Sequence, residues 1–373
     1  MQSPVIHVVF RNRCLTGETV PARFGVWWCG PGVAALVVLG LLWELASPGA
    51  QETQFFRIGA AATSGTFFEM GGVIASAISK PAGSPPCERG GNCGVPGLVA
   101  VAQATEGSVE NLRMIAAGQI ESGIAQSDIA GWAYTGAGIF TAEGPMRELR
   151  AIANLFPENV QIVVRGDSPI RTLADLKGKR VSLGQNGSGT LADARVILAA
   201  AGLTEEEMSA EYLRPGVAAT QMKEGTLDGL FLIGGAPVPI IRELAAATPI
   251  RLVSIDDTVL ARIEENSSSY RRSVIPAGTY PGIDEDIPSI GFNALWIVSA
   301  GQSDDLIYAI TKALWSDASQ RLFETHNPIG KQVRLAEALQ GLTVPLHPGA
   351  RRFYYEAGIP LGDDGSVGSV NKK

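Results

Sequence analysis

Short apolar runs alternate with amphipathic segments along the chain from residue 55 onward. A run of four to eight apolar residues indicates a buried strand, whereas apolar residues three and four apart indicate a helix with one buried face. Alternating strands and helices are typical of parallel sheets covered by helices, so the pattern predicts an α/β fold with parallel-rich sheets and helices on both faces. The expected strands are 55–61, 97–105, 122–127, 149–155, 160–166, 180–184, 227–235 and 250–255, and the expected helices are 66–79, 107–119, 128–136, 190–202, 238–247 and 257–266.

Two segments have the composition of crossings between lobes. Residues 149–169 are extended strand material interrupted at Phe156-Pro157, and residues 272–299 are rich in proline and glycine before an apolar strand. A chain that crosses twice forms one continuous and one discontinuous lobe, with a ligand cleft between them. We therefore expect lobe 1 to comprise residues 51–155 and 280–360 and lobe 2 to comprise 156–279. The polar tail, 361–373, is expected to be disordered.

The first fifty residues have the pattern of a signal peptide. Arg11, Arg13 and Arg23 precede the apolar run 33–43, and small residues follow up to position 50. Cleavage near Ala50 would release a periplasmic protein. The stretch 24–43 carries no charge, so retention as an N-terminal membrane anchor is the alternative.

Charge and cysteine content narrow the class of partner. After residue 50 the chain has 27 basic residues (30 minus three) and 35 acidic residues (37 minus two), a net charge of −8. This balance argues against nucleic acid and anionic membranes as partners. Cys87 and Cys93 lie in a loop crowded with proline and glycine, and an oxidising compartment favours a local disulfide between them. His326 and His347 lie far downstream, so no metal site is expected.

Four strand-to-helix turns carry hydroxyl, amide or glycine residues. Free backbone N–H groups and the helix dipole favour an anion at such a turn. Each turn alone could equally be a helix cap, Asp128 included. The four together predict a small polar or anionic ligand held by neutral donors. The candidate ligand-binding residues are Thr63, Ser64, Gly65, Thr66, Gln126, Ser127, Asn186, Gly187, Ser188, Gly189, Thr190 and Gly235.

Nucleotide binding and catalysis find little support in the sequence. Gly184 and Gly189 have the spacing of a phosphate loop, but Thr190 follows where the loop needs lysine. The glycine order also differs from the dinucleotide fingerprint, so no cofactor is expected. The chain lacks the H-E-x-x-H and G-x-S-x-G motifs, and His347 lies between prolines near a helix start, where a structural role is typical. We therefore expect a binding protein and not an enzyme.

Several stretches together resemble the TAXI solute receptors of TRAP transporters. They are "IGAAATSGTFF", "GSVENLRMIAAGQIESGIAQSD", "LRAIANLFPENVQIVVR", "DLKGKRVSLGQNGSGT", "DGLFLIGGAP" and "PLHPGARRFYYEAG". The resemblance covers about residues 55–360 and implies a two-lobed type II periplasmic binding-protein fold. It also implies a carboxylate ligand such as glutamate or 2-oxoglutarate, and a TRAP permease as partner.

The same resemblance places turns 63–66 and 186–190, with Gln126, along the ligand cleft. Phe67 and Phe68 stand where many relatives have two tyrosines, and this difference removes two phenol hydroxyls from the first turn. The segment 168–184 has a pattern that binding proteins of ABC importers share. A substrate-binding subunit of an ABC importer is therefore the alternative function.

Overall fold

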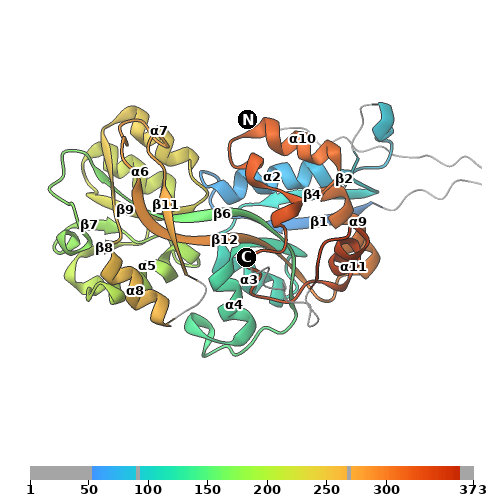
Figure 1. Ribbon diagram of the computed structural model, residues 1–373, viewed down its shortest axis with the longest axis horizontal. Helices are drawn as coiled ribbons and strands as arrows, with labels where there is room; N and C mark the ends of the chain where they lie inside the picture. Colours follow the sequence, from blue (N-terminus) through green and yellow to red (C-terminus); the bar gives the residue numbers. More distant parts are fainter. Residues whose placement is uncertain (1–52, 90–92, 267–269, 362–373) are drawn as a thin grey trace, which may run out of the picture. The chain divides into compact units, whose positions relative to one another are not determined.

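The computed structural model describes residues 53–89, 93–266 and 270–361 (Figure 1). The predicted signal peptide and nearly all of the tail predicted to be disordered lie outside the described residues. Within the described part of the chain, no helix has both the length and the apolar character needed to cross a bilayer.

The α/β fold predicted from the sequence is confirmed, because strands and helices alternate along most of the chain. The strands are β1 Gln54–Gly59, β2 Ser79–Lys80, β3 Val95–Pro96, β4 Leu98–Gln103, β5 Ser122–Gln126, β6 Leu149–Arg165, β7 Arg180–Ser182, β8 Ser209–Glu211, β9 Gly229–Gly234, β10 Ile250–Val253, β11 Arg271–Ile275 and β12 Ile287–Ser299. The helices are α2 Thr66–Ile78, α3 Ser108–Ala116, α4 Ser127–Thr135, α5 Gly189–Ala200, α6 Pro215–Glu224, α7 Pro239–Ala247, α8 Asp257–Asn266, α9 Asp304–Leu314, α10 Asp317–His326 and α11 Pro348–Glu356.

The described residues form a ten-stranded sheet in which two long strands, β6 and β12, hold the middle (Figure 1). The order is β4-β1-β5-β12-β6-β9-β7-β8, with β10 added to β6 and β11 added to β12. Parallel pairs occur among β4, β1 and β5 and among β9, β7 and β8. The central pairs are antiparallel because β12 returns along β6. The sheet is therefore mixed, with parallel pairing on each side of an antiparallel centre.

Strand β6 corrects one prediction. The sequence suggested two strands separated at Phe156-Pro157, but the structure has one strand of 17 residues that continues through both. Pro157 lies opposite Asn293 of β12, and the pairing shifts register beside it, between Ala294 and Leu295. Proline cannot donate to the ladder and is tolerated in a strand at such an irregularity. The extra residue of the irregularity is Leu155, two positions before the proline, and the strand continues through Pro157.

Apolar side chains form separate cores along the two long strands. The first core, defined here as the cluster drawn from residues 56–156 and 294–354, also includes Ala192 of α5. The second core comprises two clusters within residues 160–292. Alternate residues of β6 point to opposite faces, so α5 and α8 pack over one face of the sheet and α6 and α7 over the other.

Each of the two long strands contributes residues to both cores, and each changes from one core to the other at one point. On β6 it changes between Phe156 and Val160, and on β12 between Phe292 and Ala294. The predicted lobe boundaries at 155/156 and 279/280 remain a proposal. The packing supports the first and would move the second into β12.

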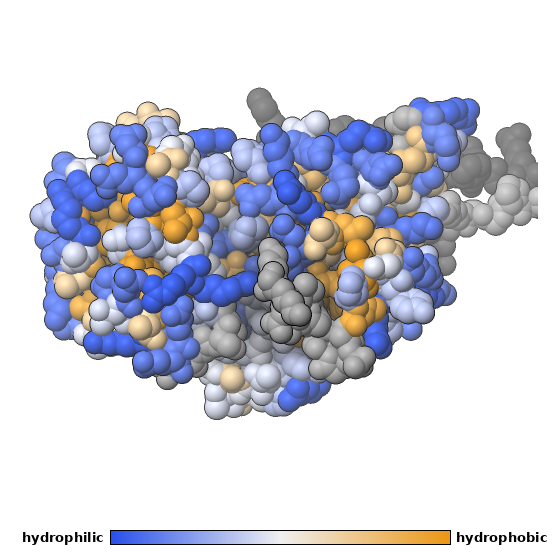
Figure 2. Space-filling view, viewed as in Figure 1, coloured by the Kyte–Doolittle hydropathy of each residue, from blue (hydrophilic) through white to orange (hydrophobic). Residues whose placement is uncertain are grey.

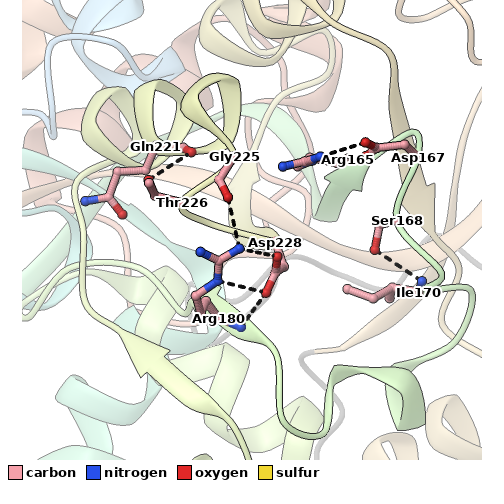
Figure 3. Close-up of polar contacts among 9 residues, drawn as sticks. All are labelled: Arg165, Asp167, Ser168, Ile170, Arg180, Gln221, Gly225, Thr226 and Asp228. Carbon is pink, nitrogen blue, oxygen red and sulfur yellow. Dashed lines mark hydrogen bonds and ion pairs between the residues drawn. The ribbon is translucent and has the colours of Figure 1, made fainter.

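Polar contacts fix the end of α6 to the neighbouring strands (Figure 3). The Arg180 guanidinium donates to both carboxylate oxygens of Asp228, over 3.1 and 2.6 Å, and to the carbonyl of Gly225 at 3.0 Å. Gly225 ends α6 in the left-handed conformation, with φ 76°. A cation beside the last carbonyls of a helix satisfies an acceptor and interacts favourably with the dipole. These contacts hold α6, whose other end borders the site described below.

Cys87 and Cys93 form a disulfide, as the sequence predicted. Closing so short a loop stabilises the fold by about 2 kcal/mol, chiefly by restricting the unfolded chain.

Figure 2 shows that the visible face is largely hydrophilic, with apolar side chains gathered in small separate areas.

Candidate functional site

Helices α2, α3, α5 and α6 all begin at one cavity of about 60 Å³. Their first residues, Thr66, Ser108, Gly189 and Pro215, line it, and so does Gln126, the N-cap of α4. The first N–H groups of a helix have no intrahelical partner, and the dipole places partial positive charge there. Several helix N-termini around one small space favour an anion more than one terminus does.

The structure brings six of the predicted ligand-binding residues together around this cavity. They are Gly65, Thr66, Gln126, Ser188, Gly189 and Thr190. They come from segments more than one hundred residues apart, on both cores. Their meeting at one place is the main structural support for the candidate site.

Other predicted residues lie elsewhere. Thr63 and Ser64 line an adjoining open cleft of about 680 Å³. The hydroxyl of Ser127 accepts a hydrogen bond from the Asn293 backbone N–H at 3.2 Å. Ser127, Asn186, Gly187 and Gly235 do not line the cavity, and Asn186 is exposed.

The hydroxyl groups at the two main turns have different partners. The Ser188 hydroxyl accepts from the Leu191 backbone N–H at 3.1 Å and donates to the Gln185 carbonyl at 2.6 Å. It is therefore the cap of α5. Thr66 is buried and caps nothing, because Gly65 is the N-cap of α2 and has no side-chain bond. Among the described residues, the partner of the Thr66 hydroxyl is the Gly235 carbonyl, at the long distance of 3.4 Å.

The charged side chains near the cavity are one carboxylate in its lining and one guanidinium in the adjoining cleft. Among the described residues that line the cavity, none is lysine or arginine, and Glu106 is the acidic one. The Glu106 carboxylate forms an ion pair with Arg214, which lines the adjoining cleft and precedes α6. The pair raises the pKa of the Arg214 guanidinium, first through the hydrogen bond and then through the charge of Glu106. Helix ends and neutral donors supply the positive potential inside the cavity.

Three further hydrogen bonds join the two sides. The Gln185 amide donates to the Glu106 carbonyl at 2.8 Å, and the Glu110 backbone N–H donates to the Gly187 carbonyl at 3.1 Å. The Gln126 amide donates to the Asp193 carboxylate at 2.8 Å. With the Glu106–Arg214 pair, these contacts close the cavity.

The sequence interpretation missed Glu106, Ser108, Gln185 and Arg214. Ser108 follows a glycine at a helix start, which is the signature used for the other turns, so the same rule could have found it. Proline at the first position of α6 marks a helix start just after Arg214. Glu106 and Gln185 carry no local signal, because their partners lie about 80 to 110 residues away.

His347 has the structural role that the sequence favoured. Its ring Nδ1 accepts from the Gly349 backbone N–H at 3.2 Å and so caps α11. Burial lowers the pKa of the imidazole, and the Asp304 charge opposes that shift. The sequence allows Asp128 to be either a helix cap or a ligand-binding residue. In the structure Gln126 is the N-cap of α4, and Asp128 lies in the first turn of that helix.

The chain belongs to the NMT1-like family, whose match covers residues 58–358. It is also similar in structure to the periplasmic aliphatic sulphonate-binding protein SsuA from Escherichia coli, with 17% identity, a TM-score of 0.39, and 86% of this chain and 83% of that one covered. A second similar structure is the alkanesulfonate-binding SsuA from Xanthomonas axonopodis pv. citri bound to MOPS, with 18% identity, a TM-score of 0.42, and 85% and 97% covered. A third is the substrate-binding protein of an amino acid ABC transporter, with 12% identity, a TM-score of 0.40, and 75% and 99% covered.

Proposed function

We propose that this protein is a periplasmic solute receptor that captures a small carboxylate and releases it unchanged. The observation that carries this proposal is the meeting of helices α2, α3, α5 and α6 at one cavity. The free N–H groups of α2, α3 and α5 can donate to a carboxylate, whereas α6 begins with Pro215, which has no N–H. The dipoles of all four helices stabilise the charge without a cationic side chain. An anion there would neutralise the converging positive ends.

Closure of two lobes over the ligand supplies the mechanism. Thr66 and Ser108 belong to the side of the first core, whereas Gly189 and Pro215 belong to the side of the second. A ligand that contacts both sides binds the closed form better than the open form and shifts the population by that difference. A cavity of about 60 Å³ can hold several waters, since one water needs roughly 10–15 Å³. Displacing such waters would make room for the anionic head of a ligand.

A second anionic group would reach the adjoining cleft. That cleft shares Ala62 with the cavity and is lined by Arg214. Guanidinium groups recognise carboxylates through paired hydrogen bonds. This arrangement supports ligands like glutamate or 2-oxoglutarate, which the resemblance to TAXI receptors also implies.

The membrane partner is one of two classes. The resemblance to TAXI receptors supports a TRAP permease, whereas the pattern of residues 168–184 is shared with binding proteins of ABC importers. The description of the NMT1-like family names neither transporter. Ligand uptake into vesicles separates the classes, because an ABC importer requires ATP and a TRAP permease requires an ion gradient.

Thermal unfolding of the purified protein with a panel of ligands tests the proposal. The panel contains amino acids, oxo-acids, alkanesulfonates, sugars and nucleotides, and the protein is first unfolded and refolded to remove co-purified ligand. A ligand at one hundred times its dissociation constant stabilises the native state by about 2.7 kcal/mol, so a carboxylate should raise the melting temperature and be recovered intact. Stabilisation by sugars or nucleotides alone, or turnover of the ligand, would contradict the proposal.

A further inference from the structure

Three buried carboxyl groups form a cluster that is joined to the cavity by Gln126, a lining residue that donates to Asp193. Asp128 on α4, Glu158 on β6 and Asp193 on α5 are exposed by 0%, 1% and 0%. Among the described residues, no lysine, arginine or histidine forms an ion pair with any of them. Buried carboxylates are normally paired, because an isolated buried charge is costly. This cluster therefore needs protons to be stable.

The hydrogen bonds of the cluster show where protons are needed. Asp193 accepts from the Gln126 amide at 2.8 Å and from the Tyr270 hydroxyl at 3.1 Å. Among the described residues, the carboxyl oxygens of Asp128 and Glu158 have no close hydrogen-bond partner, and the backbone N–H groups of Asp128 and Ile129 lower the Asp128 pKa by less than burial raises it. Two ionised carboxylates cannot hydrogen-bond to each other, but a proton on Asp193 provides a bond to Asp128. Protonation thus supplies the partner that Asp128 lacks.

Burial is the largest cause of a raised pKa at all three carboxyl groups. The charge of Asp128 further raises the pKa of Glu158 and of Asp193. Burial raises the pKa of Tyr270, and the charges of Asp193 and Asp128 raise it further, so its hydroxyl stays a donor.

Within the part of the chain that the structure describes, the neighbouring elements add no compensating charge to the cluster. The titratable groups that face it are Asp128 from α4, Glu158 from β6, Asp193 from α5 and Tyr270 before β11. Strand β5 contributes the uncharged Gln126. From β12, uncharged Phe292 lies opposite Glu158 and packs against the Tyr270 ring.

The cluster also spans the two sides that close over the cavity. Asp128 lies on the α4 side of the contact and Asp193 on the α5 side. Ala192 of α5 packs into the first core and Trp132 of α4 packs against the second. Gln126 lines the cavity and holds Asp193 at the same time. Opening the cavity would separate α4 from α5 and expose Asp128 and Asp193 to water.

We propose that ligand capture is coupled to proton uptake at the Asp128–Glu158–Asp193 cluster, so that the closed form gains population as the pH falls; this rests on the proposed function. In the open form, water returns the pKa of the exposed carboxyls toward ordinary values, near 4 for Asp and Glu. Closure raises the pKa and so binds protons. The stability that protonation gives to the closed form is complete at a pH below the ordinary pKa values. It is lost as the pH rises through the raised pKa values of the closed form.

Calorimetric titration of 2-oxoglutarate in two buffers of different ionisation enthalpy measures the protons taken up. We expect net proton uptake on ligand binding, and an affinity that falls as the pH rises, by about tenfold per pH unit for each proton taken up. The double variant Asp128→Asn/Asp193→Asn should bind the ligand without proton uptake. The side-chain amide introduced at position 193 can still accept from Gln126 and can donate to residue 128. The control is Asp305→Asn, an exposed position on α9 that should retain the wild-type uptake. Binding without proton uptake by the wild type would overturn the proposal.

A ligand-free measurement separates this proposal from the proposed function. Small-angle scattering of the unliganded protein should give a smaller radius of gyration at pH 5 than at pH 8, and the double variant should lose that difference. If 2-oxoglutarate does not bind but the difference is present and lost in the variant, the cluster proposal stands and the ligand class fails. A radius independent of pH, with no proton uptake, would overturn the cluster proposal. Should the double variant not fold, Asp193→Asn alone replaces it with the same expected direction, because it removes the carboxyl that carries the proton shared with Asp128.

Discussion

The turn before α2 and the turn before α5 both place a hydroxyl residue at the start of a helix that borders the cavity. In the second turn the Ser188 hydroxyl is used within the turn, where it accepts from Leu191 and donates to Gln185. In the first turn Thr66 has one long contact with the Gly235 carbonyl, and the cap position is a glycine. Similar sequence therefore supplies a structural cap on one side and a weakly bound donor on the other.

The glycines of these turns also differ in the space around them. A Cβ added at Gly189 would lie against the Gln126 side-chain oxygen and 2.9 Å from the Ser108 hydroxyl. At Gly65 the nearest atom would be the Ala62 carbonyl, at 3.3 Å. The second turn is therefore the close-packed side, and the first is the looser side.

The largest effect on affinity is expected from Gly189→Ala. The new methyl group would displace Gln126 and break its hydrogen bonds to Ser108, on the same side of the cavity, and to Asp193, on the other side. Losing bonds of this kind should weaken ligand binding by roughly 3 kcal/mol, more than a hundredfold. Gly65→Ala is the matched control and should bind within a few-fold of the wild type. Equal affinities for the two variants in a calorimetric titration would show that the close packing at Gly189 does not matter for ligand binding.

Thr66→Ala should have the next largest effect. The substitution removes a donor that the fold does not use as a cap, so we expect a loss of roughly 1.5–3 kcal/mol of binding, ten- to a hundredfold. The unliganded melting temperature should change little. A lowered melting temperature with unchanged affinity would show that the hydroxyl is structural.

Ser188→Ala should show the opposite result. Removing a serine cap costs about 1 kcal/mol of folding stability, while binding should weaken only slightly, because the hydroxyl already has two partners. Urea unfolding of the unliganded protein measures the stability, and Ser188→Asn provides the rescue, since asparagine also caps. Strong loss of affinity with intact stability would place Ser188 in direct contact with the ligand.

The smallest effect is expected from Arg214→Gln. Its ion pair with Glu106 joins the two sides but is partly exposed, and such pairs contribute little and are screened by salt. For ligands with one carboxylate we expect a loss of a few-fold at low salt that disappears at high salt. Titrations of acetate at both ionic strengths measure it, and a salt-independent loss would point to a contact with the ligand itself.

Much of the fold followed from local pattern. The alternation of apolar runs and amphipathic segments predicted the strands and helices around both turns, because burial of one face sets their periodicity. The prediction of a break at Pro157 was wrong, since the sequence does not show that β12 goes on pairing with β6 on both sides of the proline. Helix α6 was missed, although Pro215 and Gly225 mark its two ends.

The candidate site was predictable in its donors but not in its contacts. Hydroxyl and glycine residues at strand-to-helix turns are visible in the sequence, because caps and close backbone approaches need them. Which hydroxyl is consumed by a cap depends on the fold, as Thr66 and Ser188 show. The pairing of Gln126 with Asp193 depends on segments that meet only in three dimensions.

A crystal structure of the protein with the carboxylate that stabilises it most would show where the ligand binds. We expect the carboxylate in the cavity, with its oxygens about 2.7–3.2 Å from the backbone N–H groups of Thr66, Ser108 or Gly189, the usual hydrogen-bond range. A carboxylate bound only elsewhere, with the cavity unchanged, would contradict the proposed function.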